Sequence, residues 1–209
     1  SEKDFRAFLR KIFDESRLKY YEHPFRPHFN IETPDFNVLH VDTTLVQRSE
    51  QEINDLIVGT SALYSACKTL NKDKPTILLT HFPFTCLLQD ERKVVSEILC
   101  KNYVNLWLAG HEHDHNCQPV KYLYQVQAGV LRHESKACST VLIGSLDLVT
   151  LRGYMSAYTW FPEGWAEYPI LWHNYTEENK FPFVLRLLKD NGLSPEAKLI
   201  QKSNQNYYV

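Results

Sequence analysis

The sequence predicts an α/β fold in which two sheets form a sandwich flanked by helices. Two patterns predict it. Between residues 36 and 115, short apolar runs alternate with amphipathic helical runs, the order expected for parallel strands joined by right-handed crossovers. From residue 122 to 187, strand-like runs follow one another with short connections. This second pattern indicates mostly antiparallel strands, so we expect a βαβαβ unit followed by antiparallel strands.

Composition favours a folded domain in a reducing compartment. The chain has 209 residues, of which 44% are apolar and 13% aromatic, and its formal net charge is -2. That charge does not indicate a strongly basic surface for nucleic acid. No C-x-x-C pair occurs among the five cysteines, which are Cys67, Cys86, Cys100, Cys117 and Cys138. We predict free thiols and a cytoplasmic location. No apolar run reaches the roughly 18 residues of a membrane span, so no membrane contact is expected.

The chain divides into three predicted parts. Residues 1–35 are expected to form an amphipathic helix over 2–18 and then an irregular, proline-rich connection. Residues 36–188 are expected to form the α/β domain. Residues 189–209 are polar and are expected to be a tail or an exit helix.

Hydrophobic periodicity places the individual elements of the domain. In its first half, apolar residues at strand or helix spacing predict strands at 36–41, 76–80 and 103–109 and helices at 50–70 and 90–101. In its second half, strands are predicted at 122–128, 140–148, 155–161, 168–173 and 181–187. Between 158 and 165 lies an aromatic hairpin, which we expect to pack under the sheet or against a neighbouring domain rather than stack on a nucleic-acid base.

Histidines follow two of the predicted strands directly. His81 ends the strand at 76–80, and Gly110, His111 and His113 follow the strand at 103–109. At extended spacing, side chains two residues apart point the same way, and Gly110 would permit a sharp turn. Because imidazole is a common transition-metal ligand, and open α/β sheets bind ligands at the carboxyl ends of their strands, we predict that His81, His111 and His113 ligate metal.

Other polar residues are assigned outside the metal site. His23, His28, His40 and His173 are expected to belong to the scaffold. His115 is expected to be an exposed loop residue rather than a fourth ligand, and Asp42 is expected to have a structural role at a strand end. Glu112 and Asp114 alternate away from the histidines. The spacing is not H-E-x-x-H, which disfavours a zincin-type protease. For His133 two positions stay open, the lining of the substrate pocket and an exposed turn, and we assign it to substrate binding.

Two ordered motifs give the sequence a family resemblance. Thr80-His81-Phe82-Pro83, followed by Gly110-His111-Glu112-His113, resembles the later motifs of the calcineurin-like metallophosphoesterases. The segment Gln125–Gly129 resembles that family's next strand and glycine turn. The resemblance implies an αββα sandwich and two divalent transition-metal ions, Mn, Fe or Zn. It also implies that His81 and His111 bind one ion and His113 the other, and that the reaction is hydrolysis of a phosphomonoester or phosphodiester.

The sequence departs from this family in its first motifs. D-x-H, G-D-x-x-D and G-N-H-[DE] are absent, so the chain resembles a carboxyl-terminal half. Beyond the metal ligands, no catalytic residue is assigned within it. We expect a phosphate-ester substrate, a class that includes nucleotides and nucleic acids, and further domains of a larger protein. Two alternatives stay open, a non-catalytic interaction or regulatory module of a larger assembly and a structural, mononuclear zinc site.

Overall fold

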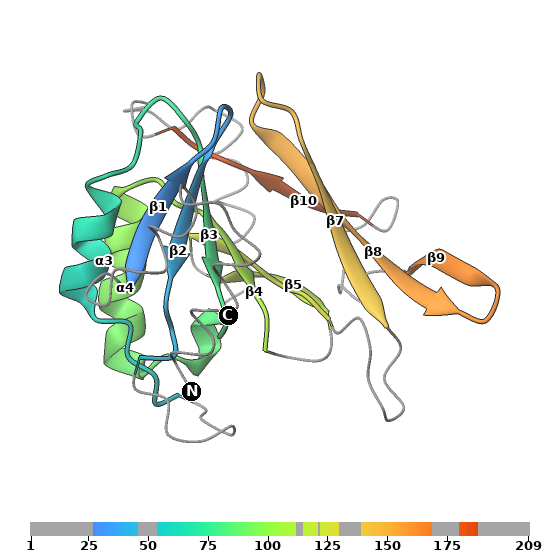
Figure 1. Cartoon of the computed structure of the whole chain (residues 1–209), viewed down its shortest axis with the longest axis horizontal. Helices are drawn as coiled ribbons and strands as arrows, with labels where there is room; N and C mark the ends of the chain where they lie inside the picture. Colours follow the sequence, from blue (N-terminus) through green and yellow to red (C-terminus); the bar gives the residue numbers. More distant parts are fainter. Residues whose placement is uncertain are drawn as a thin grey trace, which may run out of the picture.

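A computed structural model gives the architecture, and its strands form two sheets (Figure 1). The described residues are 27–45, 54–111, 115–120, 122–129, 139–168 and 180–187. Expectations for residues 2–18 and 189–209 lie outside these ranges. None of the helices in the described ranges is long and apolar enough to cross a membrane. The division of the chain at residues 35 and 188 stays a prediction.

The first sheet contains the predicted parallel strands. Its order is β1-β2-β3-β4-β6-β5, and neighbouring strands from β2 to β6 run parallel. The bounds are β1 His28–Glu32, β2 Asn37–Val41, β3 Thr76–Thr80, β4 Leu106–Ala109, β5 Asn116–Val120 and β6 Leu123–Gln127. The edge strands β1 and β5 pair antiparallel with β2 and β6. The strand–helix alternation of the sequence is therefore confirmed.

Helices α3 (Thr60–Cys67) and α4 (Gln89–Lys101) lie against one face of this sheet, with a short 3-10 turn, η1 (Phe84–Cys86), between β3 and α4 (Figure 1). Alternate strand residues point to that face, and Leu39, Leu78 and Trp107 are almost fully buried there. Burying a side chain of this size contributes about 1.5–3 kcal/mol. This core fixes the strands whose ends carry the histidines.

The predicted helix at 50–70 is wrong for residues 54–59, because α3 begins only at Thr60. Leu56 instead forms a parallel bridge with Leu87, and its N–H donates to Cys86 O at 3.2 Å. Gly59 has a left-handed backbone, with φ 76°, which ends the extended segment and precedes the helix. Leu56 is fully buried in the bridge, so its apolar character fits both interpretations.

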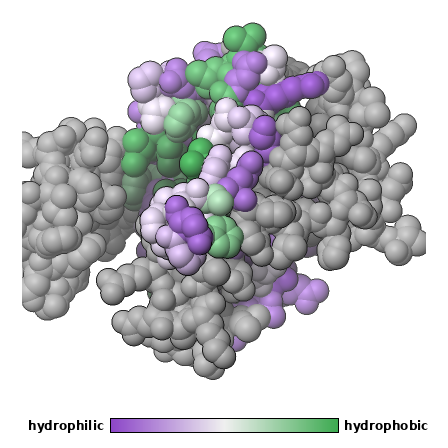
Figure 2. Space-filling view, turned by 90° about the vertical axis from the view of Figure 1, so that its right-hand side faces the viewer, coloured by the Kyte–Doolittle hydropathy of each residue, from purple (hydrophilic) through white to green (hydrophobic). Residues whose placement is uncertain are grey.

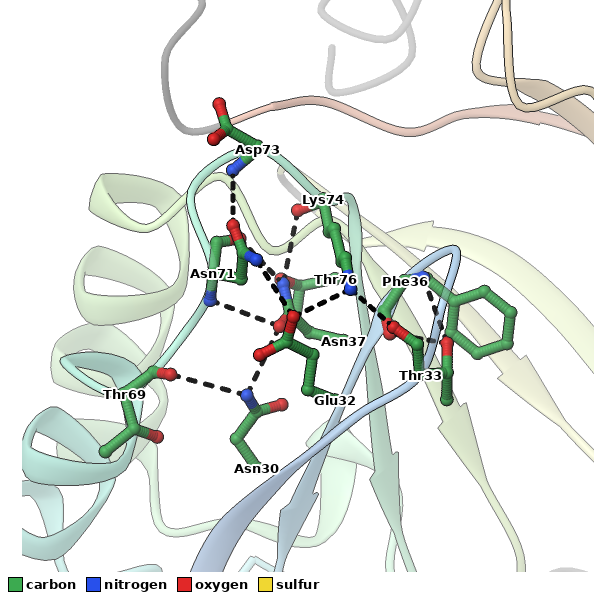
Figure 3. A network of polar contacts seen from close by, with 10 residues as sticks. All are labelled: Asn30, Glu32, Thr33, Phe36, Asn37, Thr69, Asn71, Asp73, Lys74 and Thr76. Atoms are coloured by element: carbon green, nitrogen blue, oxygen red, sulfur yellow. Dashed lines mark hydrogen bonds and ion pairs between the residues drawn. The ribbon is translucent and has the colours of Figure 1, made fainter.

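The irregular connection predicted over 20–35 is wrong for residues 28–32, which form β1. This strand is positioned by a polar network around Asn37, at the amino end of β2 (Figure 3). The Asn37 amide nitrogen lies 2.9 Å from Asn71 O and 3.2 Å from Thr76 Oγ1. Its carbonyl oxygen accepts from Asn30 Nδ2 and from Asn71 N, each at 3.2 Å. Beside it, Lys74 pairs with Glu32 at 2.7 Å.

The second sheet confirms the antiparallel second half. Its order is β10-β8-β7, and β9 also pairs with β8. The bounds are β7 Thr140–Leu146, β8 Arg152–Phe161, β9 Gly164–Tyr168 and β10 Lys180–Val184. Leu106 and Val126 of the first sheet pack in one buried cluster with Met155, Phe181 and Phe183 of the second. The fold is thus α/β with two packed sheets.

Two expectations for the second half need correction. The strand predicted at 122–128 exists as β6, but it belongs to the first sheet, because it pairs parallel with β4. The hairpin turn leads to β9, which the prediction did not separate from the turn; of the strand predicted at 168–173, only Tyr168 is described. The sheet to which β6 belongs is set by its pairing with β4, and the local apolar pattern does not reveal that partner.

Candidate functional site

The two described histidines of the predicted site do come together. His81 follows β3 and His111 follows β4 after Gly110, and these strands are parallel neighbours. Their ring centroids lie 5.3 Å apart in an edge-to-face arrangement. The Gly110 N–H donates to His81 O at 2.9 Å, which joins the two loops directly. The carboxyl edge of the first sheet therefore presents two imidazoles side by side.

His111, and not Gly110, has the unusual backbone in this turn. The φ angle of His111 is 70°, in the left-handed region that L-residues rarely adopt. Gly110 is not in that region, and a Cβ placed on it would make ordinary contacts with His81 at 3.6 and 3.7 Å. The reason predicted for the glycine is therefore wrong. Left-handed backbone at a non-glycine residue costs about 1–2 kcal/mol and is frequent at functional sites.

Hydrogen bonds from several strands hold the loop after His81. Thr43 Oγ1 accepts from the Phe82 N–H at 2.9 Å, and the Thr80 hydroxyl donates to Phe82 O at 2.7 Å. The Phe84 N–H donates to Gln125 Oε1 at 2.9 Å. Thr43 and Gln125 are fully buried. Sequence reasoning missed both residues, although each is a polar residue next to or within an apolar strand.

A further buried contact connects the site to the core. The indole N–H of Trp107 donates to Thr80 Oγ1 at 2.6 Å, and Thr80 in turn donates to Phe82 O. The ring of Phe82 lies 4.1 Å from the ring of His111 and 4.7 Å from that of His81, measured between centroids. The two imidazoles are thus positioned by a rigid, buried support.

The electrostatic environment favours a neutral imidazole at His81. Partial burial lowers the pKa of His81, and the neighbouring His111 lowers it further, because a second positive charge nearby is unfavourable. A metal ligand must be deprotonated at the coordinating nitrogen. The geometry and the lowered pKa therefore both suit ligation.

The described residues supply only part of a metal site. Across the ranges given above, no three His, Cys, Asp or Glu side chains gather closely enough to hold an ion. His113 and His133 lie outside the described residues, as do Glu112 and Asp114. Structural zinc sites commonly have four protein ligands, and catalytic ones three. Two imidazoles fit one side of such a site and require further donors.

Asp42 takes no part in this histidine pair. Its Oδ1 accepts from the N–H and the hydroxyl of Thr44, each at 2.7 Å, so it stabilises the end of β2. This agrees with the structural role expected from the sequence. His115 immediately precedes β5 and is half-buried, with its Nε2 shielded from solvent, so the expectation of an exposed loop residue is wrong.

His28 and His40 belong to the scaffold, as expected. His28 Nδ1 accepts from the Asp42 N–H at 3.1 Å, so its Nε2 carries the proton and donates to Val58 O at 2.6 Å. His40 stacks on Phe29 with 4.6 Å between ring centroids. Burial lowers the pKa of both histidines. The other two predicted scaffold residues, His23 and His173, lie outside the described ranges.

Cys67, Cys100 and Cys117 are free thiols, and burial raises the pKa of the Cys67 and Cys117 thiols to about 12, which makes them poor nucleophiles. Trp160 and Trp165 pack edge-to-face at 5.5 Å and are 50% and 48% exposed. The hairpin therefore does not lie under the sheet, and packing against a neighbouring domain stays a prediction.

Comparison with known proteins gives one sequence relative. No family model matches the chain. A stretch of 114 residues is 30% identical to YydB of Bacillus subtilis, an uncharacterized metallophosphoesterase-like protein. The chain is related to metallophosphoesterase-like proteins. The match covers 50% of this chain and 23% of YydB, so the chain spans less than a quarter of that relative. The activity of a whole protein is therefore not carried over from it.

Two solved structures are similar to this chain over part of its length. A double mutant of Vps29 from Entamoeba histolytica has a TM-score of 0.37 and 10% identity, covering 82% of this chain and 65% of Vps29. A candidate 5′-nucleotidase from Staphylococcus aureus has a TM-score of 0.32 and 10% identity, covering 87% of this chain and 34% of that protein. The strand order of this chain itself shows the two-sheet α/β architecture.

Proposed function

We propose that this chain contributes to a metal-dependent phosphoesterase that hydrolyses a phosphomonoester or a phosphodiester. One observation carries the proposal: His81 and His111, from the carboxyl ends of adjacent parallel strands, meet with 5.3 Å between their ring centroids. Open α/β sheets bind ligands at this edge, and paired imidazoles there suit a transition metal. The relationship to a metallophosphoesterase-like protein supports the same conclusion.

Within this proposal, His81, His111 and His113 hold two divalent ions, Mn, Fe or Zn, in a dinuclear centre. When bound, such ions neutralise phosphate charge and lower the pKa of a coordinated water. The chain's own residues orient the imidazoles and keep His81 neutral. Thr43, Thr80 and Gln125 act as positioning residues, through the hydrogen bonds that fix the loop after His81.

Completion of the centre requires residues outside this chain. Three histidines do not provide a carboxylate to bridge two ions, and Asp42 is engaged with Thr44. We therefore propose that acidic ligands come from other parts of a larger protein. His133 is proposed to contact the phosphate ester. Nucleotides and nucleic acids belong to the proposed substrate class, and the proposed location is the cytoplasm.

A second candidate function is a non-catalytic interaction or regulatory module. The observation that favours it is the incomplete donor set, since no three ligating side chains gather among the described residues. In that case the histidine pair would be a remnant, and the exposed surfaces would serve a partner.

Hydrolysis assays distinguish the two candidates. We would assay the protein at its natural length with 4-nitrophenyl phosphate and bis(4-nitrophenyl) phosphate, with Mn²⁺ or Zn²⁺ added and after chelation. His81→Ala and His111→Ala should each reduce metal-dependent turnover by at least about 100-fold, the scale of losing an essential electrostatic group. His40→Gln is the matched control, because His40 lies in the same sheet but stacks on Phe29. Turnover by the wild type that is unaffected by chelation, or unchanged in both alanine variants, would reject the phosphoesterase proposal.

A further inference from the structure

Two tryptophans lie exposed on the β8–β9 hairpin of the second sheet. Trp160 of β8 and Trp165 of β9 are direct partners in the antiparallel register, and their ring centroids lie 5.5 Å apart. Trp160 is 50% exposed and Trp165 is 48% exposed. The hairpin projects from the second sheet on the side away from α3 and α4 (Figure 1). About half of the surface of this tryptophan pair is therefore open to solvent.

The tryptophan pair lies on the outer face of its hairpin. Successive side chains on a strand point to opposite faces, so Met155 and Ala157 lie on the other side of β8 from Trp160. That other side packs in the buried cluster between the two sheets. On the side of the molecule where the hairpin projects, pale residues of intermediate hydropathy lie beside strongly hydrophilic ones (Figure 2). Packing in the core between the sheets therefore does not account for the tryptophan pair.

The charge around the tryptophan pair is negative. Glu163 lies in the turn that joins the two strands, and Glu167 lies two residues after Trp165, on the same face of β9. Both side chains are exposed, and neither forms an ion pair with the part of the chain that the structure describes. From residue 153 to 168 the sequence contains no lysine, arginine or histidine. A cation that approaches the indoles therefore meets carboxylates and no positive charge from the hairpin.

Other exposed aromatic rings in this molecule already hold a cation. The Lys180 ammonium lies 4.8 Å from the ring centroid of Tyr154, on the same face of the second sheet as the tryptophan pair. On α3, the Lys68 ammonium lies 4.5 Å from the ring centroid of Tyr64. Tryptophan attracts cations to its face more strongly than tyrosine does. Within the described ranges, no lysine or arginine takes the corresponding place over the tryptophan pair.

We propose that the tryptophan pair, together with Glu163 and Glu167, binds an arginine-bearing segment of a separate protein. The planar guanidinium of arginine stacks on an indole face and donates paired N–H groups to a carboxylate, so it matches both parts of this surface better than lysine does. The hairpin projects from the sheet, so a separate protein can reach it (Figure 1). The proposal involves neither metal nor hydrolysis, so it does not rest on the proposed function.

The same charges disfavour other occupants. Phosphate groups of a nucleic acid would be repelled by Glu163 and Glu167, although bases can stack on exposed indoles. A second copy that docked hairpin against hairpin would bring the same carboxylates together, which is unfavourable. A positively charged planar group is the ligand that both the rings and the carboxylates attract.

Titration of the natural-length protein with synthetic peptides tests the proposal. The probe is a short, capped peptide with two arginines, and the readout is the indole N–H signals of protein labelled with ¹⁵N-tryptophan. We expect a Kd below about 1 mM, which weakens about threefold with lysine in place of arginine and at least about tenfold with citrulline. Citrulline keeps the planar shape of arginine but carries no charge. Equal binding of the arginine and citrulline peptides, or no binding of either, would overturn the proposal.

Variants of the hairpin locate the binding site. Trp165→Ala should weaken binding of the arginine peptide by about tenfold or more, and Glu167→Gln by about threefold. Tyr122→Ala and Glu97→Gln are the matched controls, because they change an exposed aromatic ring and an exposed carboxylate outside the hairpin. Losses as large in the controls as in the hairpin variants would contradict the assignment. The peptide comparison uses the wild type alone, so it decides the question where Trp165→Ala does not fold.

The same signals reveal any other occupant. A single-stranded oligonucleotide that shifts them at lower concentration than the arginine peptide would make the tryptophan pair a stacking platform for bases. Signals that move with protein concentration alone would indicate self-association. Indoles that are shielded from a soluble quencher in the natural-length protein, without peptide binding, would assign the surface to a segment of the same polypeptide. Each of these results would overturn the proposal.

Discussion

The two ends of the first sheet differ in how completely their polar groups are satisfied. At the amino end, Asn37 finds its partners inside the described chain, in Asn30, Asn71 and Thr76 (Figure 3). At the carboxyl end, His81 and His111 are also held side by side. In the part of the chain that the structure describes, however, fewer than three ligating groups gather there. The polar groups of the amino end thus bind one another in a complete network. The two imidazoles of the carboxyl end form only part of a set of ligating groups.

The largest loss of stability is expected from disrupting the Asn37 network at the amino end of the first sheet. Asn37→Ala would leave the Asn71 N–H and two carbonyl groups of the partly buried loop before β3 without the Asn37 side chain as a partner. Unpaired buried groups cost about 1–3 kcal/mol each, so we expect a loss of roughly 3 kcal/mol in the free energy of unfolding. Asn102→Ala, which removes one bond to Ile98 O, should cost about 1 kcal/mol. Urea unfolding measures both, and similar losses would contradict the network's importance.

The next effect separates positioning from stability at the carboxyl end. Thr43→Ala removes the acceptor of the Phe82 N–H and should lower stability by about 1–2 kcal/mol. It should also weaken Zn²⁺ binding, measured by calorimetry, since the His81 loop loses its orientation. Thr43→Ser keeps the hydroxyl and should restore Zn²⁺ binding. Failure of the serine variant to restore binding would show that Thr43 acts through packing alone.

Acid should destabilise the protein through its scaffold histidines. Burial lowers the pKa of His28 and His40 from the ordinary 6.5, so the unfolded chain binds more protons than the folded one below that value. The contribution of these two histidines to the free energy of unfolding is therefore fully present above pH 6.5. It falls as the pH decreases below that value, by at most about 1.4 kcal/mol per pH unit for each histidine. Unfolding free energies from pH 5 to 8 test this. His40→Phe should flatten the profile, and an unchanged slope would exclude His40.

The smallest effect concerns the backbone of His111. His111→Gly relieves a left-handed conformation, with φ 70°, and should change stability by no more than about 1 kcal/mol, in the stabilising direction. It should also abolish metal binding. Leu151→Gly, at φ 56°, is the control for the backbone and should leave metal binding unchanged, but its gain should be smaller because Leu151 packs against the core between the sheets. Thermal unfolding with and without Zn²⁺ measures both effects. A loss of stability in His111→Gly would contradict the claim that the backbone of His111 is strained.

Local patterns predicted the elements whose structure depends on local periodicity. β2, β3, β4 and α4 (Gln89–Lys101) were expected from apolar spacing, and the meeting of His81 and His111 followed from their place after adjacent parallel strands. The start of α3 was not, because the Leu56–Leu87 bridge replaces helical turns. Thr43 and Gln125 were missed because their bonds join residues 39 and 41 positions apart, which leaves no local signal.

The metal content of the natural-length protein tests the central claim most directly. Elemental analysis of wild type, His81→Ala and His111→Ala, with His40→Gln as the control, would count the bound ions per chain. We expect about two transition-metal ions in the wild type and the control and a clear loss in both alanine variants. Wild-type protein without bound metal, even after incubation with Mn²⁺ or Zn²⁺, would contradict the account and favour a module that works by binding.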